Sequence, residues 1–116
     1  MPDEATAIGF STLIQRAPNV VVVRCRGRMV AGSHDSFYPE VRELFSDKRR
    51  IVLDLTELAH MDSAGLGTVV RIYVSARSAG CELQLVNLGP RIRQVFGIAN
   101  LLSFFTIVGE NDIRML

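Results

Sequence analysis

A chain of 116 residues can bury about two-thirds of its unfolded surface, which is enough for one hydrophobic core. Hydrophobic residues make up 48% of the chain and charged residues 22%, and this balance excludes a protein too polar to collapse. The formal net charge of +1 provides no extended field for a polyanion, so we expect no nucleic-acid partner.

The N-terminal part of the chain predicts a β-hairpin. Alternating side chains predict strands over residues 12–15 and 20–26, and Ala17-Pro18-Asn19 supplies the turn between them. One face of the second strand is apolar throughout, whereas the other becomes polar towards its end. The apolar face carries Val21, Val23 and Cys25.

An amphipathic helix is expected over residues 36–46, because apolar residues recur there at offsets of four, seven and eight. This stripe consists of Phe37, Val41, Leu44 and Phe45. Pro39 is tolerated only near the first turn of a helix. The candidate N-caps are therefore Ser33, Asp35 and Ser36. The apolar run 51–55 that follows predicts a central strand covered on both faces.

The longest helix is expected over residues 64–79, with Gly80 placed to end it. Its apolar stripe consists of Leu66, Val69, Val70, Tyr73 and Val74. Alternation predicts a strand over residues 82–86, and Pro90 suits the first position of a third helix.

The chain is expected to close with a strand over residues 104–108 and the beginning of a short helix over residues 110–116. Strands that alternate with helices imply a mostly parallel sheet. The predicted fold class is therefore α/β, or α+β by a stricter definition, with a mixed sheet, an N-terminal hairpin and helices mainly on one side.

Cysteine usage and hydropathy indicate a chain of the reducing cytoplasm. Cys25 and Cys81 belong to no spacing that binds metal, so we expect two buried thiols and no metal site. No apolar run approaches the roughly 18 residues needed to cross a bilayer, and no charged leader precedes an apolar segment. We therefore expect cytoplasmic location without direct membrane insertion.

The segment His60-Met61-Asp62-Ser63-Ala64-Gly65-Leu66-Gly67 lies where the central strand is followed by the longest helix. Its glycines supply two of the three that a dinucleotide-binding fingerprint needs, and no lysine follows for a P-loop. A nucleophile elbow would need glycine at position 61. Nothing in the sequence brings His34 or His60 to Ser63 together with an orienting carboxylate. The sequence therefore predicts no catalytic residue.

Two explanations for this segment stay open. In the first, Ser63 is the N-cap of the helix and Asp62 favours the positive end of its dipole. Glycine in a first turn costs roughly 1 kcal/mol relative to alanine, so Gly65 and Gly67 either permit close packing or keep the helix entrance bare. In the second, a hydroxyl at a bare helix entrance is phosphorylated, because backbone N–H groups and the dipole stabilise the added charge.

Three stretches together resemble a STAS domain, and more narrowly a bacterial anti-sigma factor antagonist. They are Ile51-Val52-Leu53-Asp54-Leu55, Met61-Asp62-Ser63-Ala64-Gly65-Leu66-Gly67 and Asn87-Leu88-Gly89-Pro90-Arg91-Ile92-Arg93-Gln94-Val95-Phe96. The resemblance covers about residues 10–110, and it implies a single STAS domain over residues 1–116.

The resemblance implies a partner-switching protein that is not an enzyme and needs no cofactor. When unphosphorylated, such a protein binds a serine-kinase anti-sigma factor, which then releases its sigma factor. Phosphorylation by that kinase ends the binding, and a phosphatase acting on phosphoserine resets the cycle. The family phosphoacceptor maps onto Ser63. The loop around it consists of Asp62, Ala64, Gly65, Leu66 and Gly67.

Side chains away from the apolar stripe of the longest helix form the expected interface. These are Thr68, Arg71, Ile72 and Ser75, and an outward Ile72 beside Arg71 suits contact with a partner. Many antagonists have Gly-Glu-Leu-Asp where this chain has Gly27-Arg28-Met29-Val30, so Arg28 joins the expected interface in place of an acidic contact. This departure leaves a second function open, a structural STAS module of a larger signalling assembly or of a lipid or anion transport system.

Overall fold

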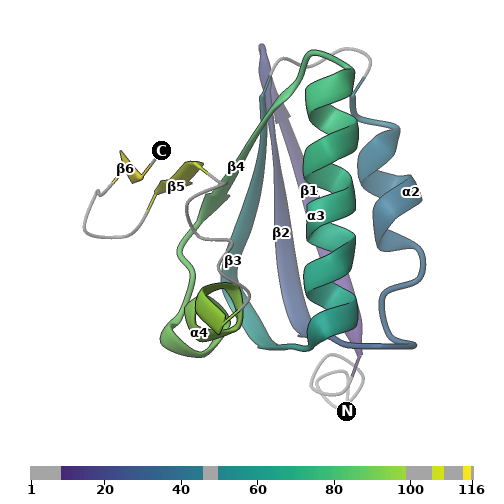
Figure 1. The fold of residues 1–116 in the computed structure, drawn as a ribbon. Coiled ribbons are helices and arrows are strands. Elements are labelled where there is room, and N and C mark those ends of the chain that lie inside the picture. The colour runs from purple at the N-terminus through teal and green to yellow at the C-terminus, as the bar shows by residue number, and fades with distance from the viewer. Residues whose placement is uncertain (1–8, 46–49, 99–105, 109–113, 116) are drawn as a thin grey trace.

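The computed structural model describes residues 9–45, 50–98, 106–108 and 114–115, which form a sheet with helices packed on it (Figure 1). The strands are β1 (Phe10–Ala17), β2 (Val20–Met29), β3 (Arg50–Met61), β4 (Glu82–Val86), β5 (Thr106–Val108) and β6 (Arg114–Met115). The helices of the described residues are α2 (Phe37–Arg42), α3 (Ser63–Ser78) and α4 (Pro90–Ile98).

The sheet is mixed, and its strands lie side by side in chain order from β1 to β6. Strands β2 to β5 are parallel to one another. The first hairpin and the pairing of β5 with β6 are antiparallel. This arrangement confirms the predicted α+β class, the mixed sheet and the N-terminal hairpin.

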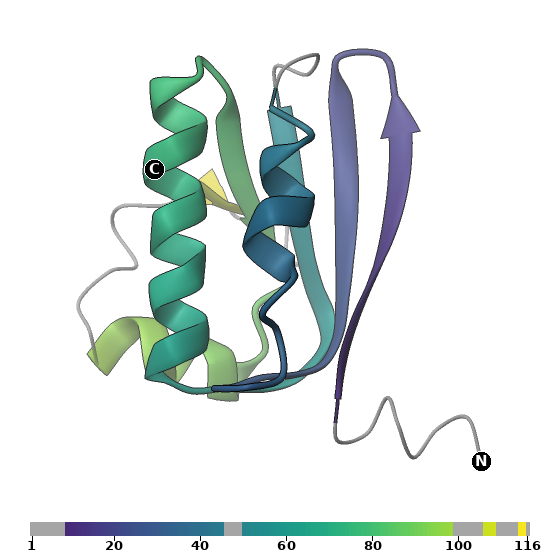
Figure 2. The ribbon, with the colours of Figure 1, turned by 90° about the vertical axis from the view of Figure 1, so that its right-hand side faces the viewer.

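Helices α2 and α3 pack side by side on one face of the sheet, and α4 lies at the end where β3 leads into α3 (Figures 1 and 2). The face of β2 towards the helices carries Val21, Val23 and Cys25, all fully buried. Arg24 points to the opposite face and is exposed. The core therefore lies between the sheet and the two helices, as the alternation in the second strand predicts.

The central strand differs from its prediction in cover and in length. Val52 and Asp54 are only half-buried, since helices cover one face of the sheet, so the expectation of cover on both faces is wrong. The strand also continues beyond residue 55 to Met61. Register shifts against β2 interrupt the alternation. These shifts keep Leu58 and Met61 in the core although this part of the strand also carries the polar residues Thr56, Glu57 and His60.

Helix α2 is shorter than expected, and Ser36 is its N-cap without a side-chain hydrogen bond. Turn hydrogen bonds continue to Phe45, and the whole predicted apolar stripe of this segment is buried. Ser46 lies outside the described residues.

The last predicted elements are only partly described. Residues 106–108 form β5, whereas residues 104–105 lie outside the described part of the chain. Arg114–Met115 form β6 rather than a helix, so the predicted terminal helix is wrong at these positions. Pairing with β5 explains this outcome, since it supplies partners for backbone groups at the edge of the sheet.

Candidate functional site

Asp62 connects β3 to α3 and is the N-cap of the helix. Its backbone is extended, and its Oδ1 atom accepts a hydrogen bond from the Gly65 N–H at 3.0 Å. Its Oδ2 atom accepts a second bond, from the Ala31 N–H, also at 3.0 Å. The prediction of Ser63 as the cap is therefore wrong, because the two-oxygen carboxylate satisfies donors of two separate segments at once.

The same hydrogen bonds stabilise the ionised form of Asp62. The Ala31 N–H, followed by the Gly65 N–H, lowers the pKa of this carboxyl group from its ordinary value, because both bonds favour the ionised form. A fixed negative charge therefore lies directly beside Ser63 at neutral pH.

Ser63 is the first residue of α3, and its side chain is exposed to solvent. Within the described part of the chain its hydroxyl has no hydrogen-bond partner. Ala64 is exposed beside it. A transferring enzyme can therefore reach the Ser63 oxygen, and a phosphate there would face the N–H groups and the positive dipole end of α3.

The two glycines of the loop have different roles. A Cβ atom at Gly65 would lie 2.2 Å from the Met29 carbonyl oxygen, so this glycine permits the close approach of α3 to the end of β2. A Cβ atom at Gly67 would meet nothing within 4 Å. Gly67 leaves the outer surface of the first turn bare, whereas Leu66 between the two points into the core. Close packing therefore explains Gly65, and a bare helix entrance explains Gly67.

The segment between β2 and α2 is held against the first turn of α3. Ser33 Oγ accepts a hydrogen bond from the Val30 N–H at 3.1 Å and lies 2.7 Å from the Arg28 carbonyl oxygen. The His34 imidazole is buried, donates from Nδ1 to the Val30 carbonyl at 2.8 Å, and places Nε2 3.0 Å from Thr68 Oγ1. His34 is thus a positioning residue that the sequence reasoning missed, since no spacing pattern links it to α3.

The remaining predicted interface residues of α3 lie along its seam with α2. Ser75 Oγ is 2.6 Å from the Tyr38 hydroxyl oxygen. The Arg71 guanidinium carbon lies 3.9 Å from the centre of the Tyr38 ring, a cation–π contact. Arg71 remains exposed, and Thr68 and Ser75 are half-buried, so their outer edges are available to a partner.

The prediction of an outward Ile72 is wrong, because this side chain is fully buried. Val74, which the sequence pattern places in the inner stripe, is 55% exposed. The buried face of α3 consists of Gly65, Leu66, Val69, Ile72 and Ala76. Leu66 and Val69 of the predicted stripe are buried, and Val70 and Tyr73 are half-buried and pack against the core, so the errors are confined to Val74 and Ile72. The other two residues of the buried face are small and contribute little to an apolar pattern.

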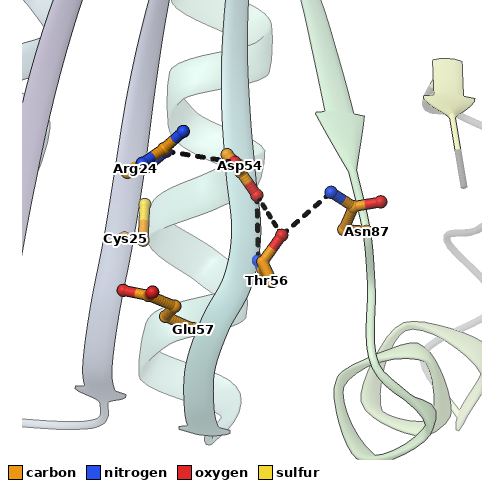
Figure 3. A pocket seen from close by; sticks show the side chains of 6 residues that line it. All are labelled: Arg24, Cys25, Asp54, Thr56, Glu57 and Asn87. Carbon is orange, nitrogen blue, oxygen red and sulfur yellow. Dashed lines mark hydrogen bonds and ion pairs between the residues drawn. The ribbon is translucent and has the colours of Figure 1, made fainter. Parts of the chain in front are cut away.

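A concave region lies on the helix-free face of the sheet (Figure 3). It has a volume of about 360 Å³ and is lined by Arg24, Cys25, Asp54, Thr56, Glu57 and Asn87. Its polar groups pair with one another: Asp54 accepts from Thr56 and forms an ion pair with Arg24, and Asn87 donates to Thr56 (Figure 3). The hollow therefore leaves few unmatched polar groups for a ligand.

Both cysteines are buried free thiols, as their spacing predicts. Burial, followed by the charge of Asp54, raises the pKa of Cys25 far above its ordinary value, so this thiol is protonated at neutral pH. Cys81 donates to the Phe45 carbonyl oxygen at 3.0 Å. The protonated, buried Cys25 sulfur therefore does not have the character of a nucleophile.

Among the described residues, no three His, Cys, Asp or Glu side chains are grouped so as to hold a metal ion. No helix of the described segments has the length and apolar character needed to cross a membrane.

The STAS domain family matches residues 11–112, and this chain belongs to that family. The anti-sigma-B factor antagonist of Listeria monocytogenes is 37% identical to this chain over an alignment of 90 residues. The alignment covers 70% of this chain and 79% of that protein.

Two solved structures have the same fold. The anti-sigma factor antagonist SpoIIAA in its unphosphorylated form superposes with a TM-score of 0.73 at 19% identity, covering 87% of this chain and 90% of that one. The Bacillus cell fate determinant SpoIIAA in the phosphorylated form gives 0.68 at 19% identity, covering 87% and 94%. These similarities confirm the STAS-like fold that the sequence resemblance implies.

Proposed function

We propose that this protein is an anti-sigma factor antagonist that acts in the cytoplasm as a partner switch and not as an enzyme. The single observation that carries the proposal is the exposed Ser63 hydroxyl at the first position of α3, beside the ionised Asp62 cap. The relative in Listeria monocytogenes is an antagonist by name, which supports the same role here.

In this proposal the unphosphorylated protein binds a serine-kinase anti-sigma factor, and the kinase phosphorylates Ser63. The Ser63 oxygen forms a bond to the γ-phosphorus of ATP, the bond from that phosphorus to ADP breaks, and a kinase base takes the hydroxyl proton. A phosphatase later hydrolyses the phosphoserine. SpoIIAA, which shares the fold, is named in both phosphorylated and unphosphorylated forms, and this agrees with such a cycle.

The added phosphate brings about −1.5 to −2 charge to a surface that already carries the Asp62 carboxylate. A docked partner would have to bury this charge, and burial of an unpaired charge is costly. The α3 surface near Ser63, with Gly67 bare and Arg71 exposed, is the area from which a partner is released.

The test is incubation of the protein with ATP and the serine-kinase anti-sigma factor of its own genome, followed by mapping of phosphate by mass spectrometry. We expect one phosphoryl group on Ser63 and none on Ser63→Ala. Ser63→Ala should retain binding to the kinase, whereas Ser63→Asp should weaken it. Phosphate on another residue, with Ser63 unmodified, contradicts the proposal.

The alternative, a structural STAS module of a larger assembly, gives a different result in the same material. A scaffold would elute from native lysate as a large complex regardless of the residue at position 63. The antagonist should instead change its elution when Ser63 is replaced by Asp.

A further inference from the structure

The arginines of β2 form a row on the helix-free face of the sheet. Alternation places Arg24, Arg26 and Arg28 on that face, since the residues that alternate with them are buried, namely Cys25, Gly27 and Met29. All three belong to the strand that ends beside the entrance of α3, at the lower end of the sheet in Figure 1.

The first two arginines of the row are paired with acids of β3. Arg24 Nε lies 3.5 Å from Asp54 Oδ2, and Arg26 Nε lies 2.9 Å from Glu57 Oε1. In both cases the acid is also the cross-strand neighbour in the sheet. Each pair neutralises its own charge, so the first two arginines leave no net positive surface.

Arg28 breaks this pattern, because its cross-strand neighbour is His60. Its Nε atom is buried and is the one side-chain nitrogen or oxygen of the described residues that is buried without a hydrogen-bond partner. No ion pair of Arg28 occurs in the described segments. A buried guanidinium N–H without an acceptor is costly. The rest of the half-buried Arg28 side chain carries a positive charge that no acid of the described residues offsets, so an acid from outside would complement it.

The neighbours of Arg28 are donors as well. Arg91 Nη1 lies 3.3 Å from His60 Nδ1, and since a guanidinium can only donate, the imidazole nitrogen accepts. With Nδ1 accepting, the ring N–H is on Nε2, which is a further donor. Arg91 also lies in the first turn of α4, where no acidic residue offsets the positive end of the helix dipole. The cluster therefore consists of donors and positive charge.

This cluster, Arg28 with His60 and Arg91, lies next to the phosphoacceptor. The Asp62 N–H donates to the Met29 carbonyl at 3.3 Å, so the residue after Arg28 is bonded to the residue before Ser63. A standard protein interface buries about 800 Å² on each partner. A partner seated over Ser63 would therefore extend to this cluster.

We propose that the Arg28, His60 and Arg91 cluster is a docking site for carboxylate side chains, and that an acidic segment of the anti-sigma factor that acts on Ser63 occupies it. The inference rests on the proposed function. Arginine favours carboxylates because its planar donors match the two oxygens. Many antagonists present an acid of the Gly-Glu-Leu-Asp segment to their partner at the position of Arg28. Because this chain presents an arginine there, its partner is predicted to carry an acidic residue at the facing position.

The test measures the affinity of the purified anti-sigma factor for wild-type protein and for variants by titration calorimetry. Nucleotide is omitted, so that phosphates of ATP cannot occupy the site. Arg28→Glu and Arg91→Glu should each weaken binding about 10- to 100-fold, in the range of a charge reversal at an interface. Arg16→Glu makes the same charge change on β1, at the opposite end of the sheet, and should alter binding less than about threefold.

Arg28→Gln covers the case in which a reversed charge disturbs the fold, because it removes the charge without adding an acid. Circular dichroism confirms folding of each variant. Wild-type affinity should fall as salt rises, and less so for Arg28→Gln. Restored binding between Arg28→Glu and a partner variant with Lys in its acidic segment would support the site directly.

The two proposals fail in different ways. If Arg28→Glu and Arg28→Gln bind within threefold of Arg16→Glu while wild type binds and is phosphorylated on Ser63, the docking site is overturned and the antagonist role stands. If the wild-type protein neither binds the anti-sigma factor nor is phosphorylated by it, both proposals are overturned.

Discussion

Asp62 and Ser63 are adjacent in the sequence but divide the work of the helix entrance between them. Asp62 uses both oxygens on backbone donors, one in α3 and one in the segment before α2. Ser63 is exposed and is not needed for the cap. This division explains how a hydroxyl can be modified at this point without removing the hydrogen bonds that hold the helix in place.

The Asp62 cap predicts a pH dependence of stability. The lowered pKa in the folded state means that Asp62 stabilises the fold above its unfolded pKa, near 3.8, and that this contribution is lost as pH falls through the lower folded value. Asp62→Asn leaves one oxygen for two donors and should cost about 1 kcal/mol in the free energy of unfolding at pH 7. Urea titrations at pH 7 and pH 3 should show this difference shrink.

The exposed Asp35 is a matched control for that measurement, since it has no hydrogen-bond partner in the described residues. Asp35→Asn should change stability by less than about 0.5 kcal/mol. An Asp62→Asn protein as stable as Asp35→Asn at pH 7 would show that the cap does not stabilise the fold.

The two glycines of the first turn predict opposite effects of one added methyl group. Gly65→Ala forces a carbon against the Met29 carbonyl oxygen and should destabilise the protein by about 1–3 kcal/mol. Gly67→Ala enters open space in a helix and should stabilise it by about 0.5–1 kcal/mol. Chemical unfolding of both variants gives the comparison. Equal effects would contradict the close approach of α3 to β2.

At the scale of elements, the sequence predicted most of the fold because apolar period and turn chemistry agree along the chain. The strand over residues 82–86 has the predicted bounds, and α3 differs from its prediction by one residue at each end. The errors arise where tertiary contacts override local pattern. The central strand extends to Met61 past the polar pair Thr56 and Glu57. The buried face of α3 includes Gly65 and Ala76, which carry little apolar signal.

The candidate site was predictable in part for the same reason. Ser63 and Asp62 lie in a motif that is local in sequence, so their place at the helix entrance followed from it. His34 and the Arg28 cluster become neighbours of α3 only through strand pairing and the path of the chain after β2. No spacing in one sequence encodes those contacts.

The orientation of α3, with Ile72 towards the core and Val74 towards solvent, gives a test at the same scale. Ile72→Ala removes a fully buried side chain and should destabilise the protein by about 2–4 kcal/mol. Val74→Ala acts on a side chain that is 55% exposed and should be neutral within about 0.5 kcal/mol. Thermal and urea unfolding would distinguish the two. If Val74→Ala had the larger cost, the helix would be oriented as the sequence pattern suggested.

For the whole molecule, a switch that acts through charge should leave the fold unchanged. The free energy of unfolding of the protein phosphorylated on Ser63 is expected to lie within about 1 kcal/mol of the unmodified protein, because attraction to the dipole of α3 opposes repulsion by Asp62. Urea unfolding and hydrogen exchange of the two forms provide the measurement. Protection should be retained in β2 and β3, which are interior strands of the sheet and pair with each other along their length. Loss of protection throughout α3 on phosphorylation would mean that the protein switches by unfolding its longest helix, and that charge at the surface is not the cause of partner release.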